Sequence, residues 1–255
     1  MEESKGVPST PFDSREYFPG MATQILTGMS GYAYKEWKPD FYPASLPADG
    51  MLGHYATRFP TVEINNTFYR MPKDNVLQDW AGQVPEQFTF CLKASRRITH
   101  DNRLEDVESL LEFVLRGANV LGSRRGPMLF QLPPNMKKDV ARLERFLALL
   151  PAGAKTAIEW RHPSWFEEEV YQLLRSREVA LVVAEQEDWA TPVVSTAPWG
   201  YVRLHRSGYS DADLVRWRDT IRAQGWNEAF VFFKHEEEIA GPPIGLKFQA
   251  LTIDD

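Results

Sequence analysis

The feature of this chain that most constrains its fold is the alternation of short apolar runs with longer amphipathic segments, repeated about eight times. The apolar runs have the length and residue types of β-strands, and most of the intervening segments have the spacing of surface helices. Strands that alternate with helices indicate a parallel sheet, because parallel neighbours need a crossover connection. The eight predicted strands are Gln24–Ser30, Thr61–Asn65, Phe88–Lys93, Pro127–Leu132, Thr156–Arg161, Val179–Ala184, Tyr201–His205 and Ala229–Lys234.

Helical spacing is clearest over Glu105–Leu121, where Val107, Leu111 and Val114 fall on one stripe. The link Glu185–Gly200 contains two X-Pro steps, so we expect no full helix there. The other predicted helices are Leu46–Phe59, Asp74–Ala81, Arg142–Leu150, Glu167–Arg177 and Asp211–Gln224.

About eight strand–helix units in 255 residues predict a single TIM-like (β/α)8 barrel of the α/β class. Its site is expected at the C-terminal end of the strands. A doubly wound open sheet is the alternative, but the glycine-rich turn typical of that fold is missing after the first strand. We expect a weakly ordered leader over residues 1–20 and one domain over residues 21–255.

Composition excludes several classes of protein. A single cysteine, Cys91, rules out a disulfide framework and disfavours a cysteine zinc site. No run approaches the ~18 apolar residues of a membrane span, and no signal peptide opens the chain, so we expect a cytoplasmic protein without a membrane partner. The net charge of -6 argues against an extended nucleic-acid duplex as partner. The oligomeric state stays open.

Polar residues in the predicted strands fall on one face. Glu63 and Asn65 share a face opposite Val62 and Ile64, because side chains alternate along a strand. The outer face of a barrel packs on helices and is apolar, so the polar residues are expected to point inward near the carboxyl ends of their strands. This inward set is Glu63, Asn65, Lys93, Gln131, Glu159, Arg161, Arg203, His205 and Lys234.

The inward set contains four cations and two carboxylates. Fixed cations in a concave site favour an anionic ligand, so we predict a substrate that carries phosphate or carboxylate. The alternative is a structural salt-bridge network, which Glu185 and Glu236–Glu238 could complete. A glycosidase based on Glu63 and Glu159 is disfavoured, because the arginines would keep both carboxylates ionised.

Loops after the predicted strands add aromatic and imidazole side chains. Tyr32, Tyr69 and Trp165 are the candidates to face a ligand, because their rings can stack on a base or a sugar. His100, His162, His205 and His235 each end or follow a strand, where an imidazole can act as acid, base or ligand.

No cofactor is predicted, although a divalent metal is possible. Neither an HExxH motif nor a pair of histidines on the first strand is present. The carboxylates and imidazoles that could still gather around a metal are Glu63, Glu159, His162, Glu185, His205 and Glu236.

Seven segments resemble the YecE-like family of uncharacterised barrel proteins. They are GMSGYAYKEWKPDFYP, LGHYATRFPTVEINNTFYRMP, FTFCLKASRRITH, GPMLFQLPP, AIEWRHPSW, YVRLHRSGY and VFFKHEEEIAGPP, and together they run from about Gly28 to Leu246. The resemblance implies a TIM-like barrel and leaves the activity open. This chain has Lys234-His235 where many members of that family have an asparagine pair.

The leading functional prediction is a hydrolase or isomerase that acts on a small phosphorylated, nucleotide or sugar-like anion. Lys93, Arg161 and Arg203 would bind the anion. Glu63 or Glu159 would be the general base, and His205 or His162 would be the proton donor. The alternative is a non-catalytic module for a nucleotide or RNA end, with the same arginines and with Tyr32 and Trp165 as stacking platforms.

Overall fold

The structure, a computed structural model, describes residues 22–234 and 241–253. The predicted leader over residues 1–20, together with His235 and Glu236–Glu238, lies outside the described residues.

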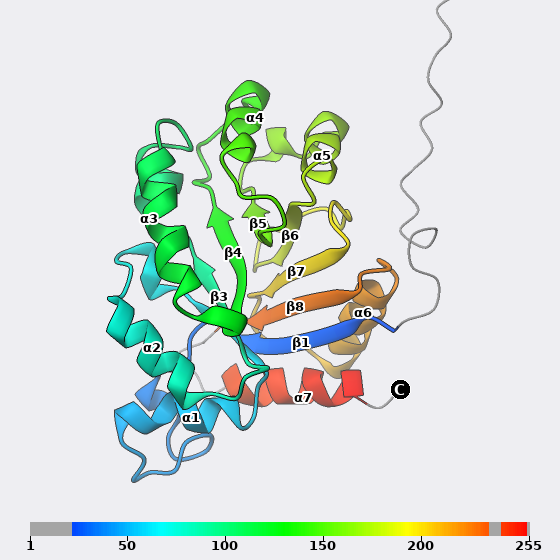
Figure 1. The fold of residues 1–255 in the computed structure, drawn as a ribbon. Helices are drawn as coiled ribbons and strands as arrows, with labels where there is room; N and C mark the ends of the chain where they lie inside the picture. The colour runs from blue at the N-terminus through cyan, green and yellow to red at the C-terminus, as the bar shows by residue number, and fades with distance from the viewer. Residues whose placement is uncertain (1–21, 235–240, 254–255) are drawn as a thin grey trace, which may run out of the picture.

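Eight parallel strands close into a barrel in the order in which they occur along the chain (Figure 1). Hydrogen bonds between β1 and β8 complete the closure, and they extend over six residue pairs from Gln24 to Met29. The predicted (β/α)8 architecture is therefore confirmed. The strands are β1 (Gln24–Met29), β2 (Thr61–Ile64), β3 (Thr89–Lys93), β4 (Arg125–Gln131), β5 (Thr156–Glu159), β6 (Ala180–Glu185), β7 (Trp199–Leu204) and β8 (Glu228–Phe233).

Several strands end earlier than predicted. β5 stops at Glu159, so Arg161 lies in the following loop. The pairing between β5 and β6 extends only over Ala157 and Ile158 of β5. Beyond Glu159 the chain turns away from the sheet and enters a 3-10 turn at Pro163. His205 and Lys234 likewise follow β7 and β8 and do not belong to them.

Helices lie outside the barrel between most successive strands (Figure 1). They are α1 (Met51–Ala56), α2 (Asp74–Gln83), α3 (Glu108–Asn119), α4 (Val140–Ala148), α5 (Glu168–Arg175), α6 (Asp211–Arg222) and α7 (Gly241–Ile253). Residues 186–198, between β6 and β7, form no helix, as their X-Pro steps predicted. The long prediction over Leu46–Phe59 shrinks to α1 and a preceding 3-10 turn at Ala48–Gly50.

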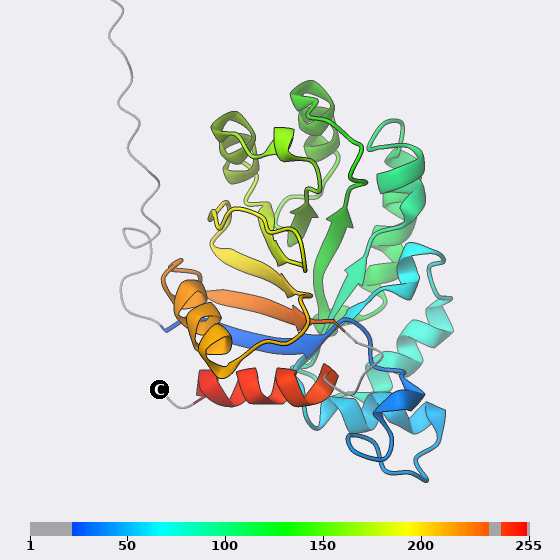
Figure 2. The same cartoon turned by 180° about the vertical axis from the view of Figure 1, so that it is seen from behind.

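Helix α7 was not predicted, because its first turn contains Gly241, Pro242 and Pro243, residues that are typical of loops. Proline is tolerated in the first turn of a helix, where its missing N–H is not needed. A Cβ at Gly245 would lie 2.9 Å from Met29 Sδ, so glycine permits the close packing of α7 on β1. Figure 2 shows α7 running beside β1, with α6 next to it.

The barrel has two apolar layers. The outward faces of the strands pack on the helices in one large cluster, which includes Val62, Phe130 and Ile158. A smaller cluster fills the interior, with members such as Cys91 and Phe232. Within the described ranges, no helix has the length and apolar character needed to cross a membrane. Polar side chains, among them Glu63, Glu159 and Arg203, gather at the end of the interior formed by the carboxyl ends of the strands, which we call the barrel mouth.

Candidate active site at the barrel mouth

Arg203 of β7 bridges two buried carboxylates from opposite parts of the barrel. Its Nε and Nη2 each lie 2.9 Å from Glu63 of β2, in a two-pronged contact. Its Nη1 lies 2.6 Å from Glu159 of β5. Both carboxylates are fully buried, and Arg203 is 4% exposed. Burial opposes the charged form of Arg203, but Glu63 and Glu159 outweigh it and raise the pKa of the guanidinium.

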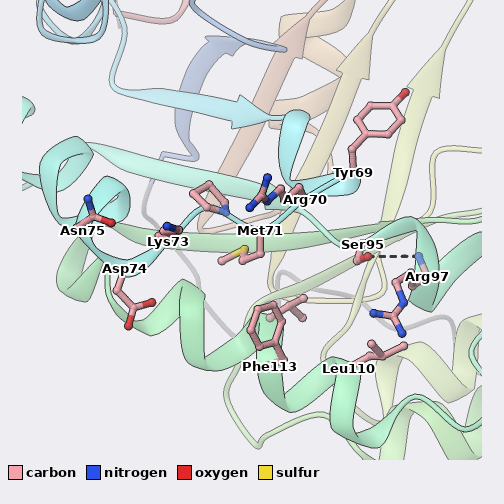
Figure 3. Close-up of a pocket in the computed structure, with 12 residues that line it drawn as sticks. Tyr69, Arg70, Met71, Lys73, Asp74, Asn75, Ser95, Arg97, Leu110 and Phe113 are labelled. Atoms are coloured by element: carbon pink, nitrogen blue, oxygen red, sulfur yellow. Dashed lines mark hydrogen bonds between the residues drawn. The ribbon is translucent and has the colours of Figure 1, made fainter.

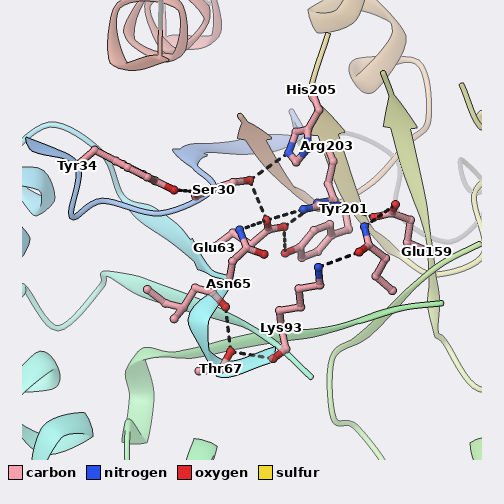
Figure 4. A network of polar contacts seen from close by, with 12 residues as sticks. Ser30, Tyr34, Glu63, Asn65, Thr67, Lys93, Glu159, Tyr201, Arg203 and His205 are labelled. Atoms are coloured by element: carbon pink, nitrogen blue, oxygen red, sulfur yellow. Dashed lines mark hydrogen bonds and ion pairs between the residues drawn. The ribbon is translucent and has the colours of Figure 1, made fainter. Parts of the chain in front are cut away.

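Glu63 is saturated with hydrogen-bond donors (Figure 4). Its Oε1 accepts from Ser30, Asn65 and Arg203, and its Oε2 accepts from Tyr201 and Arg203. Burial alone would raise the pKa of this carboxyl, but the charge and hydrogen bonds of Arg203 lower it to about 2. A carboxylate held in this way is a weak base, so Glu63 is better suited to hold Arg203 in place.

A second arm of hydrogen bonds extends from Glu159 to Lys93. Gln131 Nε2 donates to Glu159 at 2.8 Å, and Gln131 Oε1 accepts from Lys93 Nζ at 2.8 Å. The Gln131 amide can make both bonds in only one orientation, because a carboxylate only accepts and an ammonium only donates. The ammonium of Lys93 also lies 4.5 Å from the centre of the Phe68 ring.

Positive charge accumulates around Lys93. Burial, and then the charge of Arg203, lower the pKa of Lys93 from 10.5 to about 8, and Arg161 contributes in the same direction. Burial also lowers the pKa of the neighbouring His100, followed by the charges of Lys93, Arg96 and Arg161. Neither Lys93 nor Arg161 forms an ion pair with a carboxylate of the described chain, so this side of the mouth has unbalanced positive charge.

His205 is neutral at physiological pH, because burial and then Arg203 bring its pKa well below 6.5. Its Nε2 lies 3.1 Å from Ser30 Oγ, whose one proton is donated to Glu63. Nε2 must therefore carry the proton of this contact, and Nδ1 is the unprotonated nitrogen. This arrangement differs from a Ser-His-acid triad, because the serine donates to the carboxylate directly.

The structure does not support two of the aromatic ligand-facing predictions. Trp165 is fully buried, stacks on Trp160 at a centroid distance of 3.9 Å and donates to the carbonyl of Met136. It therefore packs beneath a loop and is closed to ligand. Tyr69 is 77% exposed and lines a separate pocket outside the barrel mouth, because the 3-10 turn Asn66–Phe68 carries it away from the interior.

The other predicted site residues, Tyr32, His162 and Lys234, lie around the hydrogen-bond network of Arg203 and have different surroundings. Tyr32 is half-buried and lines a hollow of about 200 Å³ together with Asn65. His162 accepts from the backbone N–H of Ser164, so it caps the turn after β5. Lys234 is exposed and lies near His205, whose pKa its charge lowers.

Sequence reasoning missed Ser30 and Tyr201 as members of the network. Ser30 directly follows β1 on its inward face, and Tyr201 precedes Arg203 by two residues. The same alternation that identified Arg203 assigns Tyr201 to the interior, so the signal was present. A hydroxyl, however, costs less to bury than a charge, so its presence in a strand is a weaker indication of a site.

A metal site built from the predicted ligands is not assembled by the described residues, in which no three His, Cys, Asp or Glu side chains form a metal-binding group. Glu63 and Glu159 face Arg203, whereas Glu185 accepts from Trp217 Nε1 at 2.9 Å. Glu185 also pairs with Arg206, so it does not neutralise the interior arginine.

Comparison with known proteins identifies the family. Over 116 residues the chain is 34% identical to the UPF0759 protein YecE of Escherichia coli K12, a match that covers 45% of this chain and 43% of YecE. The match thus spans less than half of YecE.

Solved structures resemble the fold. A DUF72 family protein from Thermotoga maritima has a TM-score of 0.78 and 25% identity, over 89% of this chain and 98% of that one. A D-psicose 3-epimerase from Clostridium cellulolyticum has a TM-score of 0.52 and 12% identity, over 84% of each chain, which shows a shared fold alone. The family model described as "Protein of unknown function DUF72" matches residues 26–253, and the chain therefore belongs to the DUF72 family.

Proposed function

We propose that the barrel mouth is the active site of an enzyme, a hydrolase or isomerase, that acts on a small phosphorylated, nucleotide or sugar-like anion. One observation carries the proposal: Arg203 engages both buried carboxylates, while Lys93 and Arg161 have no carboxylate partner in the described chain. Cations left unpaired in a concave site attract an anion from solution. A purely structural network would be expected to pair them.

Lys93 and His205 are the groups best suited to transfer protons. Lys93, with a pKa of about 8, is mostly charged at neutral pH and can both attract an anion and give it a proton. Neutral His205 offers Nδ1 as an acceptor. Glu159 accepts two hydrogen bonds from the described residues and Glu63 accepts five, so Glu159 is the better carboxylate base of the predicted pair.

The alternative is a non-catalytic module for a nucleotide or RNA end. It is favoured by the hollow beside Tyr32, which Asn65 also lines, and by the buried Oδ1 of Asn65, which has no partner among the described residues. The amide orientation is determined because Asn65 Nδ2 donates to Glu63, which leaves Oδ1 as an acceptor without a donor among the described residues. The burial of Trp165 removes the second stacking platform, and we therefore favour the enzyme.

Thermal unfolding in the presence of inorganic phosphate and ribose phosphate tests anion binding. A ligand at about 100 times its Kd stabilises a protein by ~2.7 kcal/mol, which for this size raises Tm by about 5 °C or more. Arg161→Gln and Lys93→Met should each reduce this rise by more than half. Arg177→Gln, which removes an exposed arginine after α5, is the control and should leave it unchanged. Equal shifts in all four proteins would place the anion elsewhere.

Turnover separates the enzyme from the binding module. The wild-type protein is incubated with a panel of sugar phosphates and nucleotides, and conversion is followed by NMR. For an enzyme, Lys93→Met should abolish conversion, and Arg161→Gln should raise KM more than it lowers kcat. Binding at the mouth without conversion of any panel member would favour the module.

A further inference from the structure

A second pocket lies outside the barrel, between the loop that follows β2 and helix α3 (Figure 3). Its volume is about 630 Å³, within the roughly 300–1,000 Å³ range of small-molecule sites. The loop Tyr69–Asn75 forms one wall, Ser95 and Arg97 form the end, and α3 forms the floor. We call it the outer pocket. None of the residues in the Arg203 network lines it, so it is distinct from the barrel mouth.

The floor and one wall of the outer pocket are apolar and held together by close packing. Met71 sits against α3 at Gly117, where an added Cβ would lie 2.7 Å from Met71 Cε. A side chain at Gly117 would push the end of the Met71 side chain aside, so the glycine allows Met71 to lie directly on the helix. Val114 of α3 is buried beneath the pocket. This wall of the pocket is therefore formed before a ligand binds.

Two aromatic rings border the outer pocket and remain accessible. Tyr69 is 77% exposed and Phe113 is 51% exposed, and both are among the few large apolar side chains left in solvent. Arg116 lies 5.7 Å from the centre of the Phe113 ring and supports its position. Figure 3 shows the Tyr69 ring pointing away from the pocket, whereas Phe113 borders it, so Phe113 is the ring that can stack on a planar ligand.

The polar edge of the outer pocket is cationic. Arg70, Lys73 and Arg97 line it, and none of the three has an ion-pair partner in the portion of the chain that the structure describes. Asp74 is the one carboxylate among the lining residues. The edge thus has a surplus of two positive charges (three minus one) in a chain whose net charge is -6. A positive edge next to an apolar floor complements a ligand with an apolar body and an anionic group.

We propose that the outer pocket is a second ligand site, which binds a small aromatic anion with its ring against Phe113 and its carboxylate, sulfonate or phosphate near Arg70 and Arg97. The guanidinium groups supply paired donors for such an anion. The exposed ring of Phe113 is covered when the ligand binds.

The proposal is tested with anilinonaphthalene sulfonate, an aromatic anion whose fluorescence rises on burial, and with phenylnaphthylamine, its uncharged parent. Arg97→Gln should weaken binding of the sulfonate at least about tenfold, because a charge-assisted hydrogen bond is lost, and should leave the uncharged probe nearly unaffected. Phe113→Ser should weaken both probes, by roughly threefold to tenfold. The two replaced side chains are exposed or line an open pocket, and circular dichroism verifies that both variants are folded.

Matched controls are Arg177→Gln and Ile253→Ser, which replace an exposed arginine and an exposed apolar residue elsewhere, and both should bind like the wild type. If Arg161→Gln weakens sulfonate binding and Arg97→Gln does not, the probe occupies the barrel mouth and the proposal fails. It fails equally if sedimentation shows a dimer that Phe113→Ser dissociates, because the pocket would then be a contact between copies of the chain.

Discussion

Arg203 organises the interior of this barrel at the scale of single residues. Among the described residues it is the one cation that joins Glu63 to Glu159, and Ser30, Tyr201 and Gln131 each contact one of these two carboxylates. Removing one partner of a buried ion pair leaves an uncompensated charge, which costs far more than the net value of the pair. Arg203 therefore stabilises the fold as well as the shape of the site.

Arg203→Leu should lower the free energy of unfolding by about 3–5 kcal/mol, because two carboxylates stay buried without their cation. Urea unfolding measures the change. Arg96→Leu is the matched control, since Arg96 pairs with Asp101 at 3.0 Å but both side chains are about half exposed. That substitution should cost ~0–1 kcal/mol. Similar losses in the two variants would contradict the role of the buried network.

Glu63 predicts a dependence of stability on pH. Its pKa is about 2 in the folded protein and near 4.5 in the unfolded chain, so the unfolded state binds the proton more readily. The stability that Glu63 contributes is complete above pH 4.5 and is lost as the pH falls towards 2. In magnitude it is on the order of 3 kcal/mol. Glu63→Gln should lower stability at pH 7 and flatten the acid part of the curve, as measured by urea unfolding. An acid limb as steep in the variant as in the wild type would assign the effect to other carboxylates.

Glycines decide how closely the elements of the barrel approach one another. A Cβ at Gly28 of β1 would lie 2.2 Å from the carbonyl oxygen of Thr61 in β2. The β1–β2 ladder contains only two residue pairs, Gly28 with Thr61 and Met29 with Val62, so one of them depends on glycine. Gly82, near the end of α2, has no atom within 4 Å of the equivalent position.

Gly28→Ala and Gly82→Ala should therefore shift stability in opposite directions. The first forces the backbones of β1 and β2 apart and should cost about 1–3 kcal/mol. The second adds a methyl group to a helix without a clash and should stabilise by about 0.5–1 kcal/mol. Thermal unfolding of the two variants beside the wild type measures both. Destabilisation by Gly82→Ala would show that α2 does not tolerate the added side chain.

At the scale of the whole molecule, closure of the barrel isolates its interior from solvent. Cys91, the single cysteine, lies inside with no exposed surface, and burial raises the pKa of its thiol well above 9. The thiolate is the reactive form, so the native protein protects this cysteine both by burying it and by keeping it protonated. Cys91 is thus a free thiol of the core.

Cys91 should react with a thiol reagent such as dithionitrobenzoate only when the barrel opens. A stability of about 5 kcal/mol or more predicts labelling at least about 1,000-fold slower in the native state than in urea. Arg203→Leu should accelerate labelling by about tenfold for every ~1.4 kcal/mol of stability that it loses, whereas Arg96→Leu should leave the rate nearly unchanged. Rapid native labelling would show a local opening of the interior.

The order of strands and helices was predictable from the chain because both patterns are local. Alternation along each strand also assigned Glu63, Lys93, Glu159 and Arg203 correctly to the interior side. Helix α7 escaped prediction, since the glycines and prolines that suit it to β1 look like loop residues until the partner surface is known. Strand ends were also misplaced where a neighbouring strand stopped earlier.

Sequence periodicity thus established the barrel and the direction of its side chains, because a period of two residues depends on neighbouring residues alone. The periodicity did not determine which of the inward cations form ion pairs with Glu63 and Glu159. Only the tertiary structure decided that Arg203 contacts both carboxylates and that Lys93 and Arg161 have no carboxylate partner among the described residues, since Glu63 and Arg203 are 140 residues apart. The burial of Trp165 against Trp160 and the outward position of Tyr69 were decided in the same way, by packing between elements that the sequence does not join.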